Sequence, residues 1–258
     1  MGGYSCRRRT KRTNLYQVYG KWTIPTSAAG VYVPYPNHES NILPEMLFGF
    51  YPASGSQGFD IGIFLTGNNT WKAFYGSSAG DWDEKNLNMT LTPGTTLYAN
   101  AWFEKPTSTS CVAHFTLSTT GYNNANVVNF THTLKSIDQN IINNIGAGCV
   151  INREIVIAAN VDAENTYENS GSYLYDAEFS QHTLMAVNNT SCVWSDSESA
   201  NIRTVNPFPN SSYINGSGSN INILELRKDN GTVDLSHISA TRTDVSSGAT
   251  EKVVITFR

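Results

Sequence analysis

The chain has 258 residues and a formal net charge of −4, and its charged residues make up only 15%, against roughly 25% in average soluble domains. Asparagine, serine, threonine and glycine take their place, a mix typical of short strands joined by tight turns. No apolar run of about 18 residues occurs, so no membrane-spanning helix is expected, and the acidic body disfavours a nucleic-acid groove.

The first 14 residues are expected to form a basic, flexible tail, followed by a single domain over residues 15–258. The tail holds five positive charges, at Arg7, Arg8, Arg9, Lys11 and Arg12. Such a segment can contact an acidic surface or nucleic acid, or simply keep the chain soluble. It lacks the apolar region of a secretory signal, so an exported protein has lost that signal or leaves by another route.

Strand patterns then follow one another along almost the whole chain. Each is an alternating or apolar run, rich in β-branched and aromatic residues and bounded by turn residues. The predicted strands are residues 15–24, 30–34, 46–51, 59–65, 70–75, 87–91, 96–104, 111–119, 127–134, 150–161, 173–180, 221–226, 233–240 and 252–257. This spacing predicts an all-β fold, a two-sheet antiparallel β-sandwich.

One short helix and one long loop interrupt the strands. Ser136 is a suitable N-cap for a helix that carries isoleucines at helical spacing, and Gly146 is a suitable stop. Residues 195–218 are rich in Asn, Ser and Pro and are expected to form a loop that rims a cleft or is mobile.

The run from Cys149 to Ala159 is the strongest functional signal. It has the composition of a buried strand, yet it carries Glu154, and a carboxylate is costly to bury unless it is paired, hydrogen-bonded or neutral. Alternation places Asn152 on the same face as Glu154. Glu154 is therefore a candidate general base on a rigid sheet, or else a surface carboxylate paired with a neighbour.

A second candidate surface lies on the strand that ends at Glu104. Alternation places Tyr98, Asn100, Trp102 and Glu104 on one face of that strand. Aromatic and amide side chains in such an arrangement are suited to a sugar ring or a peptide, although an ordinary solvated sheet face has the same composition.

The motifs for metals, cofactors and serine nucleophiles fit poorly. Cys6, Cys111, Cys149 and Cys192 form no CxxC pair, so zinc spacing is absent and the disulfide pairing stays open. The oxygens of Asn160, Asp162 and Glu164 are a weak calcium pattern. The GSSAG run at residues 76–80 matches a nucleophile elbow but lies between strands, where that elbow does not occur. No metal and no cofactor are expected.

Several short motifs resemble the glutamic peptidases, the eqolisin family. They cover most of the chain from Tyr16 onward, although each motif alone is weak. The similar segments are VYGKWTIP at 18–25, GIFLTG at 62–67 with Trp71 and Tyr75 after it, LTPGTT at 91–96, NREIVI at 152–157 and VDLS at 233–236. The resemblance implies a concanavalin A-like jelly roll with a concave sheet, and it places Glu154 at the catalytic glutamate.

The same resemblance shows one departure from the family. Those enzymes pair the glutamate with a glutamine that helps to bind the oxyanion, and the matching position here is Leu65. Loss of such a donor typically costs about 100–1000-fold in rate. The resemblance therefore implies the fold but not the activity.

Four hypotheses for function result, one of which treats the chain as a structural component of a surface or an assembly. The leading one is a noncatalytic, secreted or cell-surface binding module, with carbohydrate as the ligand class. Its binding residues would be Trp71, Tyr75, Tyr98, Trp102, Glu104 and Asn152. The alternatives are an acid-acting glutamic endopeptidase with Glu154 as general base, and a glycoside hydrolase that pairs Glu154 with Glu104 or Glu178. The partner is then a glycan or a polypeptide, and the oligomeric state stays open.

Overall fold

A computed structural model describes residues 2–35, 38–53, 57–104, 106–159, 169–195, 198–200, 223–224 and 237–258. Several predictions fall wholly or partly outside these residues. They are the strands at 221–226 and 233–240, the motif at 233–236, the calcium pattern at 160–164 and most of the loop at 195–218. Within the described residues the fold is an antiparallel β-sandwich, and the predicted fold class is confirmed.

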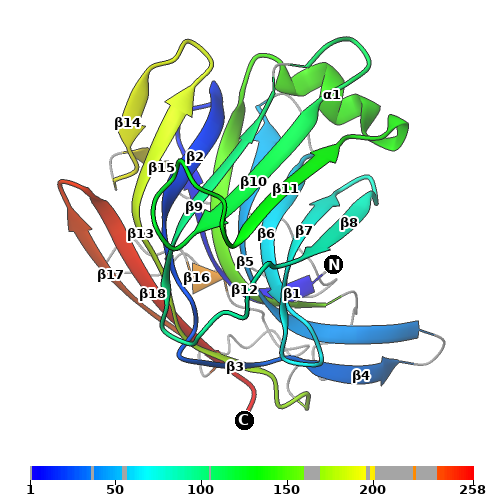
Figure 1. The fold of residues 1–258 in the computed structure, drawn as a ribbon, viewed down its shortest axis with the longest axis vertical. Coiled ribbons are helices and arrows are strands. Elements are labelled where there is room, and N and C mark those ends of the chain that lie inside the picture. Colours follow the sequence, from blue (N-terminus) through cyan, green and yellow to red (C-terminus); the bar gives the residue numbers. More distant parts are fainter. Residues whose placement is uncertain are drawn as a thin grey trace, which may run out of the picture.

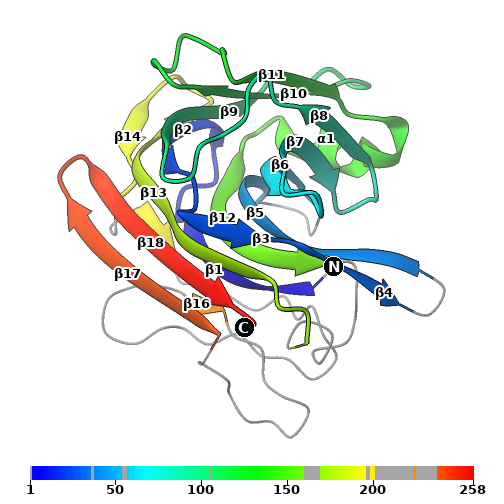
Figure 2. The ribbon, with the colours of Figure 1, turned by 60° about the horizontal axis from the view of Figure 1, so that its bottom comes forward.

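The strand pairings form two runs. One run is, in spatial order, β8 (Trp82–Asn86), β7 (Trp71–Ser77), β6 (Phe59–Leu65), β5 (His38–Pro52), β12 (Cys149–Ala159) and β1 (Gly2–Thr10). The other is β11 (Val128–Thr133), β10 (Val112–Ser118), β9 (Thr96–Phe103), β2 (Leu15–Thr23), β13 (Tyr173–Ala186), β18 (Gly248–Thr256) and β17 (Ile238–Val245). Figures 1 and 2 show the two runs as curved layers that face each other.

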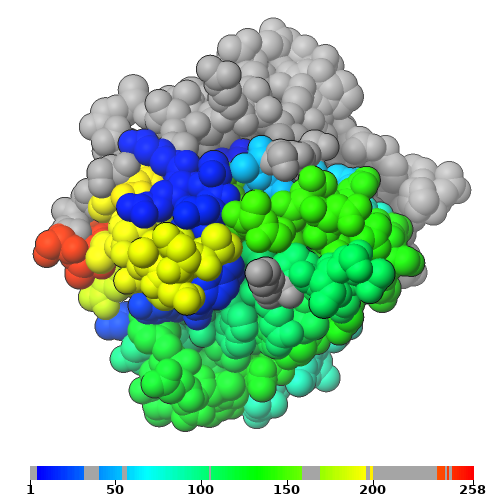
Figure 3. Space-filling model, turned by 90° about the horizontal axis from the view of Figure 1, so that it is seen from above, coloured from blue at the N-terminus to red at the C-terminus, as the bar shows by residue number. Residues whose placement is uncertain are grey.

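Short strands extend these layers at their margins. They are β3 (Ser27–Ala29) on β13, β4 (Val31–Tyr35) on β5, β14 (Ser191–Val193) on β13, and β15 (Ser199–Ala200) and β16 (Ile223–Leu224) on β1. The pairing of Cys149 with Leu15 joins the two layers. In the view from above, the blue N-terminal residues lie against the yellow β13–β14 segment (Figure 3), where the amide of Val187 donates to the carbonyl of Asn14 at 2.8 Å.

The α-helix begins later in the chain than its predicted N-cap, Ser136. Ser136–Asp138 is a turn of 3₁₀ helix, and α1 spans Gln139–Ile145 and ends at Gly146. Three isoleucines of α1 are buried, whereas Ile137 is 55% exposed. The helix therefore covers one end of the sandwich with its apolar side (Figure 1).

The main core lies between the layers and is rich in aromatic rings. Trp22 is fully buried, with Phe48, Phe115 and Phe179 at centroid distances of 5.0–5.4 Å. Alternation along each strand sends every second side chain into this core and the others to the opposite face. A separate apolar cluster of Leu47, Phe64, Phe74, Val156 and Ala158 lies on that opposite face of the β5–β12 layer.

The N-terminal segment differs from the flexible tail that the sequence predicted. Residues 2–10 form β1, which pairs with β12 from Gly2 opposite Ala159 to Arg9 opposite Asn152. The difference has a physical reason, because the basic side chains find acidic partners in the folded domain: Arg7 pairs with Glu154, and Arg8 with Glu251. The short strand predicted at 87–91 is also absent; that segment is irregular, and β8 lies just before it.

No helix among the described residues is long and apolar enough to cross a membrane.

Candidate active site

The carboxylate of Glu154 lies on the face of β12 that points away from the main core. Its neighbours Arg153 and Ile155 point into the core, while Asn152 and Glu154 share the opposite face. Register places Leu47 of β5 and Arg7 of β1 directly beside Glu154, so their side chains share that face. We call this surface of β1, β12, β5 and β6 the carboxylate face.

Arg7 makes a bidentate ion pair with the Glu154 carboxylate. Its Nε pairs with Oε2, and its Nη2 donates to Oε1 at 2.9 Å. The Glu154 side chain is only 7% exposed. A planar guanidinium that pairs with both oxygens fixes the orientation of a carboxylate as well as balancing its charge.

Asp60 of β6 reaches toward Glu154 across the intervening strand. The strand position between Asp60 and Asn152 is Gly49, and a Cβ placed there would lie 2.5 Å from Oδ1 of Asp60 and 3.5 Å from Cβ of Asn152. The missing side chain at Gly49 therefore makes the room in which the Asp60 carboxyl lies. The Tyr51 hydroxyl donates to both oxygens of this carboxyl, at 3.0 and 3.2 Å.

Burial and like charge make two carboxyls on this face hold their protons. The pKa of Asp60 is raised to about 7, first by burial and then by the negative charge of Glu154, against the lowering effects of Arg7 and of the Tyr51 hydrogen bond. The pKa of Glu45, on β5, is raised to about 8 by burial and by the charges of Asp60 and Glu154. Below about pH 7 the face thus combines an arginine-bound glutamate with two neutral carboxylic acids.

Asn152 supplies an acceptor to the same face. It is 5% exposed, and its Oδ1 has no hydrogen-bond partner in the structure. A buried amide oxygen without a donor costs about 1–3 kcal/mol, so it is suited to accept an N–H or O–H from a bound ligand.

This combination matches the requirements of acid-type hydrolysis. A carboxylate accepts a proton from water, and a neutral carboxylic acid beside it donates a hydrogen bond to a developing oxyanion.

The structure places Leu65 and Glu154 on opposite faces of the layer. Gly62 shares the face of Glu154, so Leu65, three residues further along β6, points the other way and is 2% exposed in the core. Trp71 and Tyr75 of β7 are also core residues, at 9% and 0% exposure. These aromatic candidates therefore lie on the opposite face of the layer from Glu154.

The aromatic face of β9 lies on the other layer. Tyr98, Asn100 and Trp102 do share one partly exposed face, where register adds Gln17 and Tyr19 of β2. The Trp102 ring is stacked on His114 at 4.7 Å and 6°, so one of its two faces is covered.

The two other glutamates considered for a carboxylate pair lie elsewhere. Glu104, just after β9, contacts Nε2 of His114 at 2.9 Å. Glu178 of β13 lies opposite Lys252 of β18. The carboxyls that interact with Glu154 are Asp60 and Glu45.

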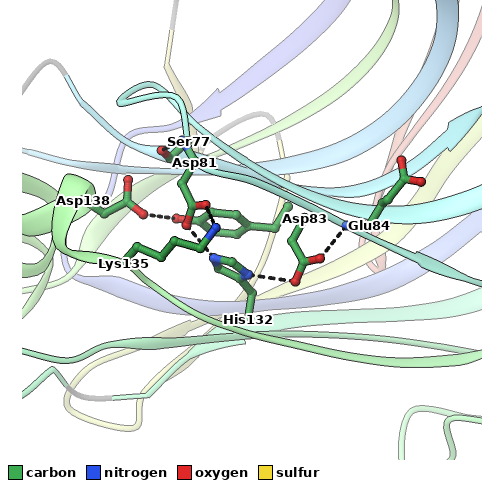
Figure 4. Close-up of polar contacts among 8 residues, drawn as sticks. Ser77, Asp81, Asp83, Glu84, His132, Lys135 and Asp138 are labelled. Carbon is green, nitrogen blue, oxygen red and sulfur yellow. Dashed lines mark hydrogen bonds and ion pairs between the residues drawn. The ribbon is translucent and has the colours of Figure 1, made fainter.

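A second polar cluster links the β7–β8 turn to β11 (Figure 4). His132 lies between two aspartates, with Nε2 2.7 Å from Asp81 and Nδ1 3.1 Å from Asp83, and Lys135 also pairs with Asp81. Burial alone would raise the pKa of Asp81, but the hydrogen bonds from Lys135 and His132 lower it overall. Lys135 balances the charge of Asp81 within the cluster, which is typical of a structural contact between the β7–β8 turn and β11.

A third polar group is buried in the main core. Glu251 of β18 accepts from Arg8 at 2.8 Å and from Arg153 at 3.0 Å. Arg153 also bonds Nδ1 of His182 at 3.1 Å and lies 4.6 Å from the ring centroid of Trp194. This group ties β1, β12, β13 and β18 together.

The sequence analysis identified Glu154 and Asn152 but missed the other groups of the carboxylate face. Asp60 is a single carboxyl inside the predicted strand 59–65, the same signal that identified Glu154, and that signal would have found it. Glu45 directly precedes the predicted strand 46–51 but lies inside β5. Arg7 was hidden in a basic run that has no strand pattern.

Among the described residues, no three His, Cys, Asp or Glu side chains are arranged to hold a metal ion, and all four cysteines are free.

Comparison with known proteins gives a result at the level of fold. No protein-family model and no curated protein matches the chain. Scytalido-glutamic peptidase with a transition state analog inhibitor matches with a TM-score of 0.52, at 12% identity, over 97% of each chain. The same peptidase with a peptide-based transition state analog gives 0.51, at 12% identity, over 98% of each.

A further match is SCP-B, a member of the eqolisin family of peptidases, in a complex with the tripeptide Ala-Ile-His. Its TM-score is 0.50, at 11% identity, over 97% of each chain. Identities this low show the fold alone. The chain therefore has the β-sandwich fold of the glutamic peptidases, as the resemblance of its short motifs implied.

Proposed function

We propose that the chain is an acid-acting peptidase whose reacting pair is Glu154 and Asp60. The observation that carries this proposal is the approach of Asp60 toward β12 above Gly49, beside an arginine-bound Glu154. The structural neighbours are peptidases, which supports this alternative better than the noncatalytic carbohydrate-binding module that led the sequence analysis.

In this proposal Glu154 is the general base. Arg7 occupies two of the roughly four lone-pair positions of the carboxylate, which leaves positions that can accept a proton from water. The water oxygen then forms a bond to the carbonyl carbon of a peptide, and the carbonyl π electrons move to its oxygen. The oxyanion electrons then re-form the carbonyl as the C–N bond breaks, and the proton held by Glu154 passes to the leaving amine.

Asp60 takes the role for which the family uses glutamine. Below its pKa of about 7 the carboxyl is neutral and can donate a hydrogen bond to the developing oxyanion. Above that value it becomes a carboxylate, which repels the oxyanion. Activity should therefore fall as the pH rises through about 7.

The test is cleavage of an unfolded protein substrate between pH 2 and pH 8. We expect Glu154→Gln to lower kcat/KM by about 100–10,000-fold, and Asp60→Asn by a smaller factor, because an amide still donates. Glu178→Gln is the matched control, since it changes a partly exposed glutamate of β13 that lies outside the site. Wild-type activity retained in Glu154→Gln would exclude this mechanism, and no cleavage by the wild type at any pH would exclude the function.

A binding role on the β9 face is the second candidate, because Tyr98, Asn100 and Trp102 are partly exposed on a sheet face that also carries Gln17. Titration with neutral oligosaccharides, read by tryptophan fluorescence of the wild type and of Trp102→Ala, tests it. Signal changes that are the same in both proteins would rule out this surface as the site.

A further inference from the structure

A pocket of about 600 Å³ lies at the margin of the sandwich, separate from the carboxylate face. Its walls come from the β6–β7 turn, from the end of β2 and from the segment after β8. The lining residues are Ile24, Pro25, Ala28, Leu65, Asn69, Thr70, Trp71, Asn86, Leu87, Asn88, Met89, Thr90, Leu91 and Pro93. The volume is within the range of about 300–1,000 Å³ that is usual for small-molecule sites.

The pocket is apolar at its base and carries amides and hydroxyls at its rim. Leu65, Leu91 and Trp71 are at most 9% exposed, whereas Met89 is 44% exposed and the asparagines of the rim are exposed. None of the described lining residues carries a formal charge. A charged ligand would lose water there without meeting an opposite charge.

The turns around the pocket are held by backbone hydrogen bonds. The amide of Ile24 donates to Thr95 at 2.9 Å, and the amide of Gly94 donates to Ile24 at 3.0 Å. On the other side the amide of Thr66 donates to Thr70 at 2.9 Å. These bonds define the walls before any ligand arrives, which lowers the entropic cost of binding.

We propose that this pocket binds a large, uncharged apolar side chain presented by a peptide. The base of Leu65, Leu91 and Trp71 is apolar apart from the indole N–H, so most hydroxyls of a buried sugar would lack a partner there, and each unpaired group costs free energy. The exposed rim residues Asn69, Asn86 and Asn88 carry amide groups that can pair with peptide groups on either side of an inserted side chain.

The choice of a peptide rests on the proposed function, while binding itself does not require catalysis. The pocket would hold one side chain of the polypeptide substrate away from the bond that is cleaved. Leu65, which stands where the family has its catalytic glutamine, would thereby serve binding.

The test uses blocked amino acids as probes, with binding read from the methyl NMR signals of Met89, Leu65 and Leu87. N-acetyl-tryptophanamide and N-acetyl-leucinamide at millimolar concentration should shift these signals. Each should bind about tenfold more tightly than N-acetyl-glycinamide, because only they bury apolar surface. Maltotriose should leave the signals unchanged.

Variants of a lining residue test whether the probes bind in this pocket. Met89→Ala should weaken binding of N-acetyl-tryptophanamide roughly three- to fivefold, and Met89→Leu should restore most of it. Val187→Ala is the matched control, because Val187 is also 44% exposed but lies at the β13–β14 turn.

Equal affinity for the glycine and tryptophan probes would overturn the proposal, as would binding of maltotriose alone or binding unchanged by Met89→Ala. A Glu154→Gln protein should bind the probes like the wild type. Loss of the proposed peptidase activity and loss of pocket binding are therefore separate results.

Discussion

At the scale of single residues, Gly49 decides how closely Asp60 approaches β12. A methyl group at this position would lie 2.5 Å from the Asp60 carboxyl, so Gly49→Ala must displace it. We expect a loss of about 1–3 kcal/mol in stability and a loss of peptidase activity larger than the stability change explains. Urea unfolding and initial rates of the same preparation measure both.

Gly67→Ala is the control for that substitution. A Cβ at position 67 would have only Asn41 within reach, at an ordinary contact distance of 3.7 Å. If Gly49→Ala and Gly67→Ala behave alike, the approach of Asp60 does not depend on the missing side chain.

Asp81 should stabilise the folded protein at neutral pH and should lose this effect in acid. Its pKa is lowered in the folded protein by Lys135 and His132, so the stability it contributes is present above the pKa of an unfolded aspartate and is lost as the pH falls through the folded value. Asp81→Asn should lower stability at pH 7 by about 1–3 kcal/mol and by less at pH 3. Urea unfolding at both pH values measures the difference, and a loss that is equal at both would contradict the assignment.

At the scale of elements, β18 is tied to β1 and β12 through Glu251. Its side chain is 3% exposed and carries the negative charge for both Arg8 and Arg153. Glu251→Gln removes that charge while the two guanidinium groups stay buried, so we expect a loss of about 3–5 kcal/mol. Thermal or urea unfolding measures it.

The exposed pair of Arg12 and Glu198 provides the comparison. Here both carboxylate oxygens are also paired, at 2.7 and 2.9 Å, but with a single arginine that is 41% exposed. Glu198→Gln should cost less than about 1 kcal/mol. Similar losses in the two variants would mean that burial of the Glu251 pair adds nothing.

The elements were predictable where the local pattern decides them. Phe59–Leu65 has the predicted bounds because apolar residues and a Thr-Gly turn define it locally. β1 was not predictable, because its run of arginines has no apolar alternation and its stability comes from pairing with β12, more than 140 residues away.

The candidate site was predictable only in part for the same reason. Glu154 and Asn152 could be assigned to one face from β12 alone, since alternation is local. Asp60 lies on β6 and approaches them over Gly49 of β5, and Arg7 lies on β1. Which strands lie side by side depends on long-range pairing, which no local pattern encodes.

At the scale of the whole molecule, the raised pKa values of Glu45 and Asp60 predict a contribution to stability that is present in acid and is lost as the pH rises. Glu45 and Asp60 keep their protons up to about pH 8 and pH 7, whereas unfolded carboxyls release theirs near pH 4. Between these values the unfolded chain binds fewer protons than the folded one, so stability falls as the pH rises. The contribution is full below the unfolded pKa and is lost through about pH 8.

Thermal unfolding from pH 4 to pH 9 measures this dependence, with Glu45→Gln and Asp60→Asn as the variants. Each amide removes one titrating group from the carboxylate face, so each should flatten the decline, and Glu45→Gln should act at the higher pH. Glu84→Gln, at an exposed position of β8, should leave the decline unchanged. A pH dependence from pH 5 to pH 8 that is the same in the wild type and in both amide variants would show that these carboxyls ionise freely in the folded protein. The proposed upper pH limit of activity, which needs Asp60 to stay neutral, would then have no basis.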